Sequence, residues 1–219
     1  MKRWFLAVAV VLLGWVPLQA HFLWLLPVGT NQAKLIFSDS LKPDDPALLD
    51  RVKDLRIYGH DKANKHIEMK YTKADDGFVI DVPKDVGIVC GSATYGIYQP
   101  ANSKPALLSY NVLLYLNEGN YPCENCMPLQ IQMGKQGMWT VKWEGEAMAD
   151  CDVLLMGPTG FAKQTKKTDK NGQVMFDWGS MPKGIYGLRV GQTVKEAGDL
   201  DGKKYEEQRI YSTFVFKKD

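Results

Sequence analysis

The stretch VGIVCGSATYGIYQPANSKPALLSYNVLLYL (residues 86–116) contains two apolar runs, 86–98 and 106–116, on either side of a segment rich in turn-forming residues. Short apolar or alternating runs of this kind recur along the chain, from HFLWLLP (21–27) to RIYSTFVF (209–216). Regularly spaced short strands with turn signals between them are typical of β-sandwiches. We therefore predict an all-β fold built from a sandwich or a pair of sandwiches.

The sequence predicts at most one short helix. Asp45 can cap its start, Pro46 suits its first turn, and ALLDRVKDL (47–55) follows.

A segment rich in Asn, Gly and Pro, NEGNYPCENCMPLQ (117–130), follows the long apolar strand and indicates a domain boundary. We predict an N-terminal β-sandwich domain over residues 21–120, a cysteine-containing linker over 121–133 and a C-terminal β-sandwich domain over 134–219. The two domains are expected to fold semi-independently.

The first 20 residues have the plan of a secretory signal peptide. Lys2 and Arg3 form a basic start, residues 4–16 are apolar, and PLQA ends in the small residue Ala20. The apolar run is shorter than the roughly 20 residues that a membrane helix needs. We predict cleavage after Ala20 and export to the periplasm or the extracellular space, with an uncleaved N-terminal anchor as the alternative.

Charge and hydropathy limit the partners of the mature chain. Loss of Lys2 and Arg3 leaves 25 of the 27 Lys and Arg residues, the same number as the 25 Asp and Glu residues. A neutral chain does not favour nucleic acid or an acidic membrane surface as a partner. No second apolar stretch approaches the length of a membrane span, so we expect a soluble mature protein.

The chain contains four cysteines, and an exported protein can form disulfides. Cys123 and Cys126 lie in the Pro-bracketed loop YPCENCMP, without a second C-x-x-C or a nearby histidine to complete a zinc site. We predict a disulfide between them. Cys90 and Cys151 lie in strand-like runs, where they are either buried thiols or paired with each other.

His21 directly follows the predicted cleavage site. As the first residue of the mature chain it would offer its α-amine and its imidazole Nδ1 to one metal ion. An α-amine has a pKa of about 7.7–8, low enough for a metal to displace its proton near neutral pH. Cu(II) and Ni(II) favour nitrogen ligands of this kind. We predict a metal site at His21; the alternative is that this histidine has no role.

His60 and His66 flank the segment DKANK, and LRIYGH and HIEMKYT could form a hairpin around it. Cross-strand neighbours have Cβ atoms about 4.5–5.5 Å apart, so the two histidines could share a metal ion. The alternative is two solvated histidines at the tip of a hairpin flanked by lysines.

Other motifs give little support for catalysis. DKNG (169–172) and DLDG (199–202) begin like EF-hand loops, but neither has a glutamate at the twelfth position, and we expect ordinary turns. The sequence contains no G-x-S-x-G motif and no phosphate loop. These observations favour a protein that is not an enzyme.

Several segments, in this order, carry a resemblance to a known family: AHFLWLLP, FSDSLKPDDPALLDRVKDLRIY, ATYGIYQPANSKPALLSYNVLLYL, GIYGLRV and AGDLDGKKYEEQRIYSTFVF. The chain resembles secreted bacterial proteins of unknown function that are described as nickel- or cobalt-uptake-like periplasmic proteins. The resemblance implies two β-sandwich-like halves, the second similar to the Ig-like modules found beside carboxypeptidases and surface adhesins. It also implies a metal role for His21. Family tails often carry a histidine before the tyrosine, where this chain has Ile210 before Tyr211.

We predict an exported metal-binding protein that handles or takes up nickel, cobalt or copper, with an envelope or transporter protein as its partner. The first alternative is a non-catalytic interaction module of the envelope that binds no metal. The second is an oxidative copper enzyme with a terminal-histidine brace, which would require His60 or His66 to close on His21.

Overall fold

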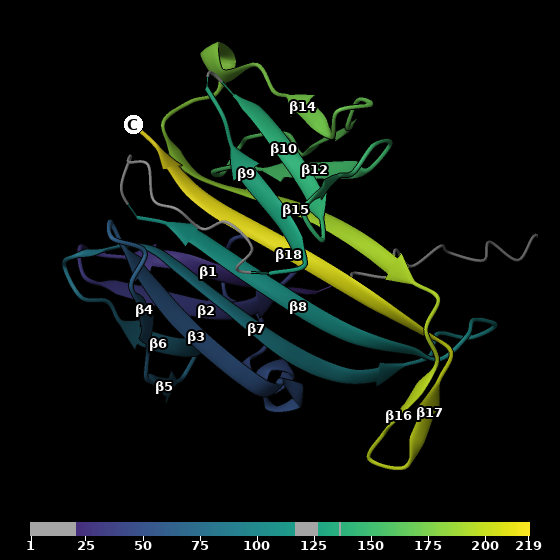
Figure 1. Cartoon of the computed structure of the whole chain (residues 1–219). Helices are drawn as coiled ribbons and strands as arrows, with labels where there is room; N and C mark the ends of the chain where they lie inside the picture. Colours follow the sequence, from purple (N-terminus) through teal and green to yellow (C-terminus); the bar gives the residue numbers. More distant parts are fainter. Residues whose placement is uncertain (1–20, 117–126, 136) are drawn as a thin grey trace, which may run out of the picture.

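The computed structural model describes residues 21–116, 127–135 and 137–219 (Figure 1). This part of the chain forms strands and two short 3-10 helices, Pro46–Arg51 (η1) and Trp178–Ser180 (η2). The predicted all-β fold is confirmed. None of the helices in these residues has the length and apolar character needed to cross a membrane.

The predicted helix forms as η1, but it is shorter than the sequence indicates. Asp45 Oδ1 accepts a hydrogen bond from Ala47 N at 2.9 Å, and Pro46 occupies the first turn. The helix ends at Arg51 because the following residues enter strand β3 (Lys53–Asp61), which pairs with the central sheet. Tertiary strand pairing thus overrides the local helical pattern.

A central sheet dominates the described residues. Its eight strands, in spatial order, are β13 (Gln164–Lys167), β12 (Asp152–Met156), β15 (Gly184–Val194), β18 (Glu207–Lys218), β8 (Ala106–Tyr115), β7 (Val86–Tyr98), β3 (Lys53–Asp61) and β4 (His66–Glu68). Within this part of the chain all its pairings are antiparallel except that between β18 and β8, which is parallel.

Two smaller sheets and a hairpin complete the described fold. One sheet has the order β1 (Phe22–Val28), β2 (Gln32–Ser38), β6 (Gly77–Asp81) and β5 (Tyr71–Ala74). The other contains β9 (Leu129–Met133), β10 (Met138–Trp143), β11 (Glu146–Ala147) and β14 (Gln173–Met175). Strands β16 (Gly198–Leu200) and β17 (Lys203–Tyr205) form a hairpin at one end of the molecule (Figure 1).

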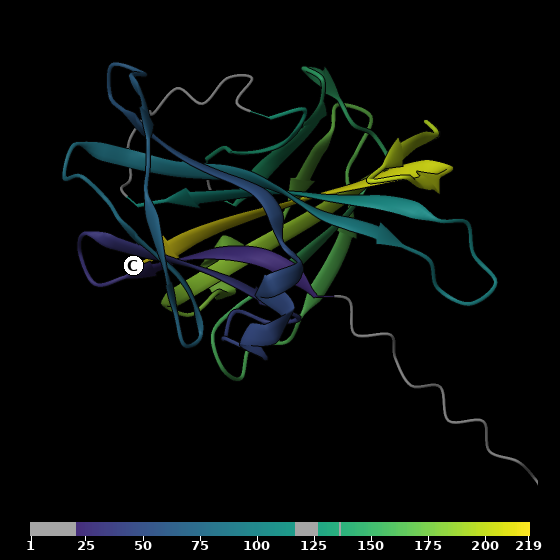
Figure 2. The ribbon, with the colours of Figure 1, turned by 90° about the horizontal axis from the view of Figure 1, so that it is seen from below.

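The side chains of the central sheet alternate between two hydrophobic cores. On β8, Val112 and Leu114 belong to the core that contains β1 and β2, whereas Leu113 belongs to the core that contains β9 and β10. On β18, Val215 and Phe214 divide in the same way. Because strand side chains alternate with a period of two, the smaller sheets cover opposite faces of the central sheet. The result is three layers, which can be followed in Figure 2.

The two predicted sandwiches therefore share their middle layer. Strand β18, from the predicted C-terminal domain, pairs with β8, from the predicted N-terminal domain, so that Tyr211 lies opposite Tyr110. Met156 and Val215 also contribute to the core that contains β1 and β2. Part of the predicted linker lies outside the described residues, and both the domain boundary and semi-independent folding stay predictions.

Cys90 and Cys151 are free, buried thiols. The alternative of a disulfide between them is wrong. Burial raises the pKa of the Cys90 thiol to about 12 and raises that of Cys151 as well. Both thiols pack with the core that contains β9 and β10. Cys123 and Cys126 lie outside the described residues, and their disulfide stays a prediction.

Candidate functional site

His21 directly precedes β1, and a carboxylate from another part of the chain holds its imidazole. The Nε2 atom of His21 lies 2.8 Å from Asp44 Oδ2, and the ring packs against Phe37 with a centroid separation of 5.7 Å. The other oxygen of Asp44 accepts a hydrogen bond from Asp45 N at 2.9 Å. The hydrogen bond with His21, followed by that from the backbone, lowers the pKa of Asp44. The carboxylate is therefore fixed in place and ionised near neutral pH.

The contact with Asp44 determines the role of each imidazole nitrogen. An ionised carboxylate only accepts hydrogen bonds, so Nε2 of His21 is the donor and, in the neutral ring, Nδ1 carries the lone pair. Nδ1 is the nitrogen that can chelate a metal together with an α-amine of the same residue. A carboxylate behind a metal-binding histidine fixes the orientation of the ring and raises its basicity. Asp44 is thus placed to fix the orientation of the His21 ring.

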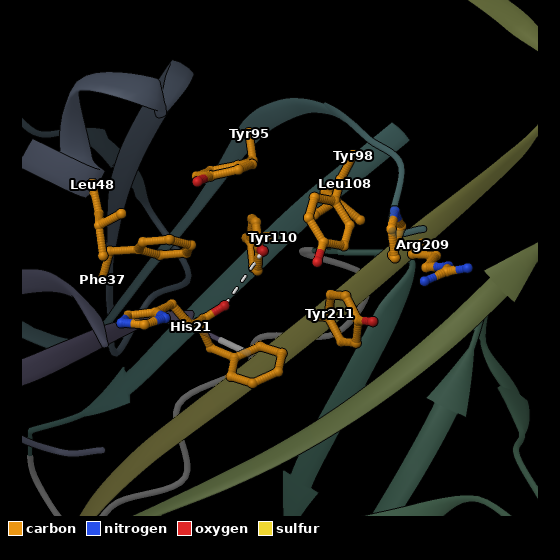
Figure 3. Close-up of a pocket in the computed structure, with 11 residues that line it drawn as sticks. His21, Phe37, Leu48, Tyr95, Tyr98, Leu108, Tyr110, Arg209 and Tyr211 are labelled. Atoms are coloured by element: carbon orange, nitrogen blue, oxygen red, sulfur yellow. Dashed lines mark hydrogen bonds between the residues drawn. The ribbon is translucent and has the colours of Figure 1, made fainter. Parts of the chain in front are cut away.

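An aromatic pocket of about 210 Å³ lies beside His21 (Figure 3). Its lining comes from the start of β1, from β2, η1, β7, β8 and β18 and from the β7–β8 connection: His21, Phe22, Phe37, Leu48, Tyr95, Tyr98, Pro100, Leu108, Tyr110, Arg209 and Tyr211. The Tyr110 hydroxyl donates a hydrogen bond to the carbonyl oxygen of His21 at 3.5 Å. Figure 3 shows Phe37 and Tyr95 on one side of Tyr110, and Tyr98 and Tyr211 on the other.

Four of the lining rings, which we call the aromatic box, form two stacked pairs. The Phe37 and Tyr95 centroids lie 5.1 Å apart, and those of Tyr110 and Tyr211 lie 5.8 Å apart, with an interplanar angle of 26° in both pairs. The pairs stand nearly at right angles, because Tyr110 makes 84° with Phe37 and 80° with Tyr95. The pocket is therefore bounded by ring planes in two directions.

Arg209 and His21 line this pocket, and each has an acidic partner within the described structure. Glu207 Oε1 accepts from Arg209 at 2.8 Å from Nε and 2.7 Å from Nη2, and Asp44 pairs with His21. Burial, followed by the neighbouring tyrosines, raises the pKa of Tyr110, so its phenol stays neutral. The pocket thus combines neutral aromatic walls with locally balanced charges.

His60 and His66 are cross-strand partners in the β3–β4 hairpin, as predicted. Their ring centroids lie 5.3 Å apart, and His66 also packs against Tyr58 at 4.2 Å. His60 is buried and its Nδ1 lies 3.1 Å from Asn64 Oδ1, which can only accept a hydrogen bond. Burial lowers the pKa of His60 and favours its neutral form. The alternative of solvated histidines therefore fits the exposed His66 but not His60.

The structure does not bring His21 together with the other two histidines. Strand register aligns His60, across β7, with Tyr115 of β8, whereas His21 contacts Tyr110. The five residue steps from Tyr110 to Tyr115 span about 17 Å along the strand. The two tyrosines also pack against opposite cores. The brace in which His60 or His66 closes on His21 is therefore not formed.

No larger metal-binding cluster is found in the part of the chain that the structure describes, where no group of three or more His, Cys, Asp and Glu side chains could hold an ion. The two EF-hand-like segments are turns, as expected. Asp169 Oδ1 accepts from the backbone of Asn171 and Gln173, and Asp199 Oδ1 accepts from Gly202 N. Their carboxylates thus satisfy local backbone donors.

This chain has Ile210 at the position before Tyr211, where tails of the family that it resembles often carry a histidine. Tyr211 lines the aromatic pocket, whereas Ile210 packs against the core on the other face of the central sheet. A histidine at position 210 would therefore point away from the His21 face. Position 210 is unsuited to supply a further ligand to a metal at His21.

Sequence reasoning missed the aromatic pocket, because its rings come from four separate segments. A signal was nevertheless present. Each ring of the aromatic box lies in a segment on which the family resemblance rests: Phe37 in FSDS, Tyr95 in ATYGIY, Tyr110 in LLSY and Tyr211 in RIYS. Strand pairing and packing bring these segments together in space, and short sequence patterns do not encode that arrangement.

Comparison with known proteins gives little further information. No family model matches the chain, and no curated protein matches it. Among solved structures, the chain is similar to a segment of two fibronectin type-III domains from chicken tenascin, with 14% identity, coverage of 87% of this chain and 97% of that chain, and a TM-score of 0.21. It is also similar to the FN1–FN3 domains of chicken CNTN1, with 14% identity, coverage of 88% and 66%, and a TM-score of 0.21. These values carry no conclusion about function, and the β-sandwich fold rests on the strand pairing described above.

Proposed function

We propose that this chain is an exported envelope protein that binds nickel, cobalt or copper through His21 at its mature N-terminus. The observation that carries the proposal is the 2.8 Å contact between His21 Nε2 and Asp44 Oδ2. It supports a fixed imidazole whose Nδ1 is the nitrogen suited to chelation. Export depends on the predicted signal peptide, residues 1–20, which lie outside the described residues.

The chemistry of the site follows from its two nitrogens. Cleavage after Ala20 would create an α-amine beside the imidazole of His21, and both would bind one ion in a single chelate. Among divalent first-row metals, nitrogen sites have the highest intrinsic affinity for copper, followed by nickel and cobalt. Metal binding requires loss of the α-amine proton, so affinity should rise with pH across the range near pH 8.

A two-nitrogen site suits metal transfer better than storage. No cluster of three or more ligands is available in the described residues, so the remaining coordination positions would be filled by water or by a partner. An ion held in this way can pass to another protein by exchange of ligands. We therefore propose an uptake or handling role together with an envelope or transporter partner.

The test is to extend the mature protein by one alanine before His21. The extension moves the α-amine to another residue and spoils the chelate, while His21 and Asp44 remain. Calorimetric titration with copper(II) should show an affinity at least about tenfold lower, or roughly 1.4 kcal/mol. His66→Ala is the matched control, because it removes an exposed histidine elsewhere and should leave the affinity unchanged.

A second measurement tests the premise of cleavage. Native mass spectrometry of the protein purified from its own envelope should give a chain that begins at His21 and carries metal. A native N-terminus at another residue, or equal copper affinities with and without the added alanine, would contradict the proposal.

A non-catalytic interaction module of the envelope is the second candidate. The layered all-β fold favours it, together with the lack of a three-ligand cluster in the described residues. The two candidates differ in one measurement, because the module should take up no copper, nickel or cobalt at the concentrations that saturate a His21 chelate.

A further inference from the structure

The aromatic box lines a cavity at the edge of the core that contains β1 and β2. Its two stacked pairs, Phe37 with Tyr95 and Tyr110 with Tyr211, stand at 80–84° to each other and border a cavity of about 210 Å³. A small group in the cavity would meet rings from two perpendicular directions. Phe22 is not counted as a wall, since the Arg189 guanidinium already lies 4.3 Å from its ring centroid.

Two of the three tyrosine hydroxyl groups of the box take part in hydrogen bonds. The Tyr110 hydroxyl donates to the His21 carbonyl oxygen, and the Tyr95 hydroxyl accepts from Arg51 Nη1 at 3.3 Å. The walls therefore act mainly through their rings. The faces of tyrosine and phenylalanine rings are electron-rich and attract cations held within about 6 Å of the centroid.

The other residues that line the pocket determine which kind of cation it can bind. None of the described residues that line the pocket is an aspartate or a glutamate, so a primary ammonium group would lose its water without gaining a carboxylate acceptor. A quaternary ammonium group has no N–H bonds to satisfy. Arg209 pairs with Glu207 and His21 pairs with Asp44, so the charges of these two lining side chains are balanced. The α-amine proposed for the mature N-terminus also belongs to His21, and choline binding should strengthen as the pH rises above the α-amine pKa of about 8, where this group is neutral.

We propose that the aromatic box binds the trimethylammonium group of a choline- or betaine-type ligand. The site is distinct from the His21 chelate, although His21 forms part of its rim, and it does not depend on metal binding. The ligand is either a free small molecule or the head group of a lipid, since both present the same trimethylammonium group.

The first experiment compares ligands on the full mature protein without added metal. Choline and tetramethylammonium should bind in an NMR titration, whereas ethanolamine and 3,3-dimethylbutan-1-ol, the neutral isostere of choline, should bind at least about tenfold more weakly. Equal binding of choline and its neutral isostere would show that the pocket recognises only apolar shape and would overturn the proposal. So would the lack of any binding of choline.

Variants locate the site. Tyr95→Leu removes one ring of the box at a half-buried position and should weaken choline binding by about fivefold, whereas Tyr95→Phe keeps the ring and should retain binding. Tyr71→Leu, on the outer strand β5, is the matched control and should have no effect. Equal binding by Tyr95→Leu and the unaltered protein would contradict the assignment. Thermal melts of each variant check that the fold is intact.

A vesicle arm distinguishes the two sources of the ligand. Co-sedimentation with phosphatidylcholine vesicles but not phosphatidylglycerol vesicles, reversed by free choline, would identify a lipid head group. Binding of free choline without vesicle binding would identify a soluble ligand. Either result supports recognition of the trimethylammonium group, while binding to both vesicle types that free choline does not reverse would contradict it.

Discussion

The two faces of the central sheet carry histidines in opposite settings. On the face covered by β1 and β2, His21 is partly exposed, pairs with the carboxylate of Asp44 and borders an open aromatic pocket. On the β3–β4 hairpin, His60 is buried and contacts Asn64, with His66 as its cross-strand neighbour. The carboxylate partner that is usual behind a metal-binding histidine is thus present at His21, whereas His60 has an amide partner.

The strongest way to break this comparison is to damage one face and observe the other. Phe214→Ala and Leu114→Ala remove fully buried side chains from the two different cores, at an expected cost of about 3–5 and 2–5 kcal/mol. Because β8 and β18 pair in the shared middle layer, we expect each variant to lower one common unfolding transition. Urea denaturation followed by fluorescence and circular dichroism would measure this.

Two separate unfolding transitions would contradict this expectation. If the protein shows two transitions and each substitution displaces only one of them, the two sandwiches fold semi-independently, as the sequence predicts, and the shared sheet does not couple them. Coincident transitions by both probes are the criterion for a single cooperative unit.

A smaller effect sharpens the comparison at the level of histidine partners. Asp44→Ala should reduce copper affinity at the mature N-terminus by about tenfold, because it removes the group that orients the ring. Asn64→Ala removes the corresponding partner of His60 and should leave copper affinity unchanged. Calorimetric titration of both variants measures the difference. Equal losses in the two variants would mean that Asp44 has no special role.

The smallest expected effect is the pH dependence of the buried histidine. Burial lowers the pKa of His60 in the folded state below its unfolded value of about 6.5, so the unfolded chain binds more protons as the pH falls through that interval. Stability should therefore decrease as the pH falls from about 6.5 to the folded pKa of His60, and His60→Gln should make this decrease smaller. NMR titration of the His60 ring gives the pKa directly, and a midpoint above about 6.5 would refute the prediction.

Much of the local structure could be predicted from the sequence. Alternating apolar runs predict the strands, Asp45 and Pro46 predict the start of η1, and the turns at DKNG and DLDG follow from ordinary backbone chemistry. The pairing of His60 with His66 was also accessible, because only five residues separate them. These features depend on residues that are close together in the sequence.

The sequence by itself determined that this protein is all-β, where most of its strands lie and which histidines are candidates for metal binding. Only the tertiary structure decided that Asp44 meets His21, that Tyr211 lies beside Tyr110, and that Ile210 faces the other core. The physical reason is register. A shift of one residue moves every side chain of a strand to the opposite face, and the parallel pairing of β18 with β8 is set by packing between segments about a hundred residues apart.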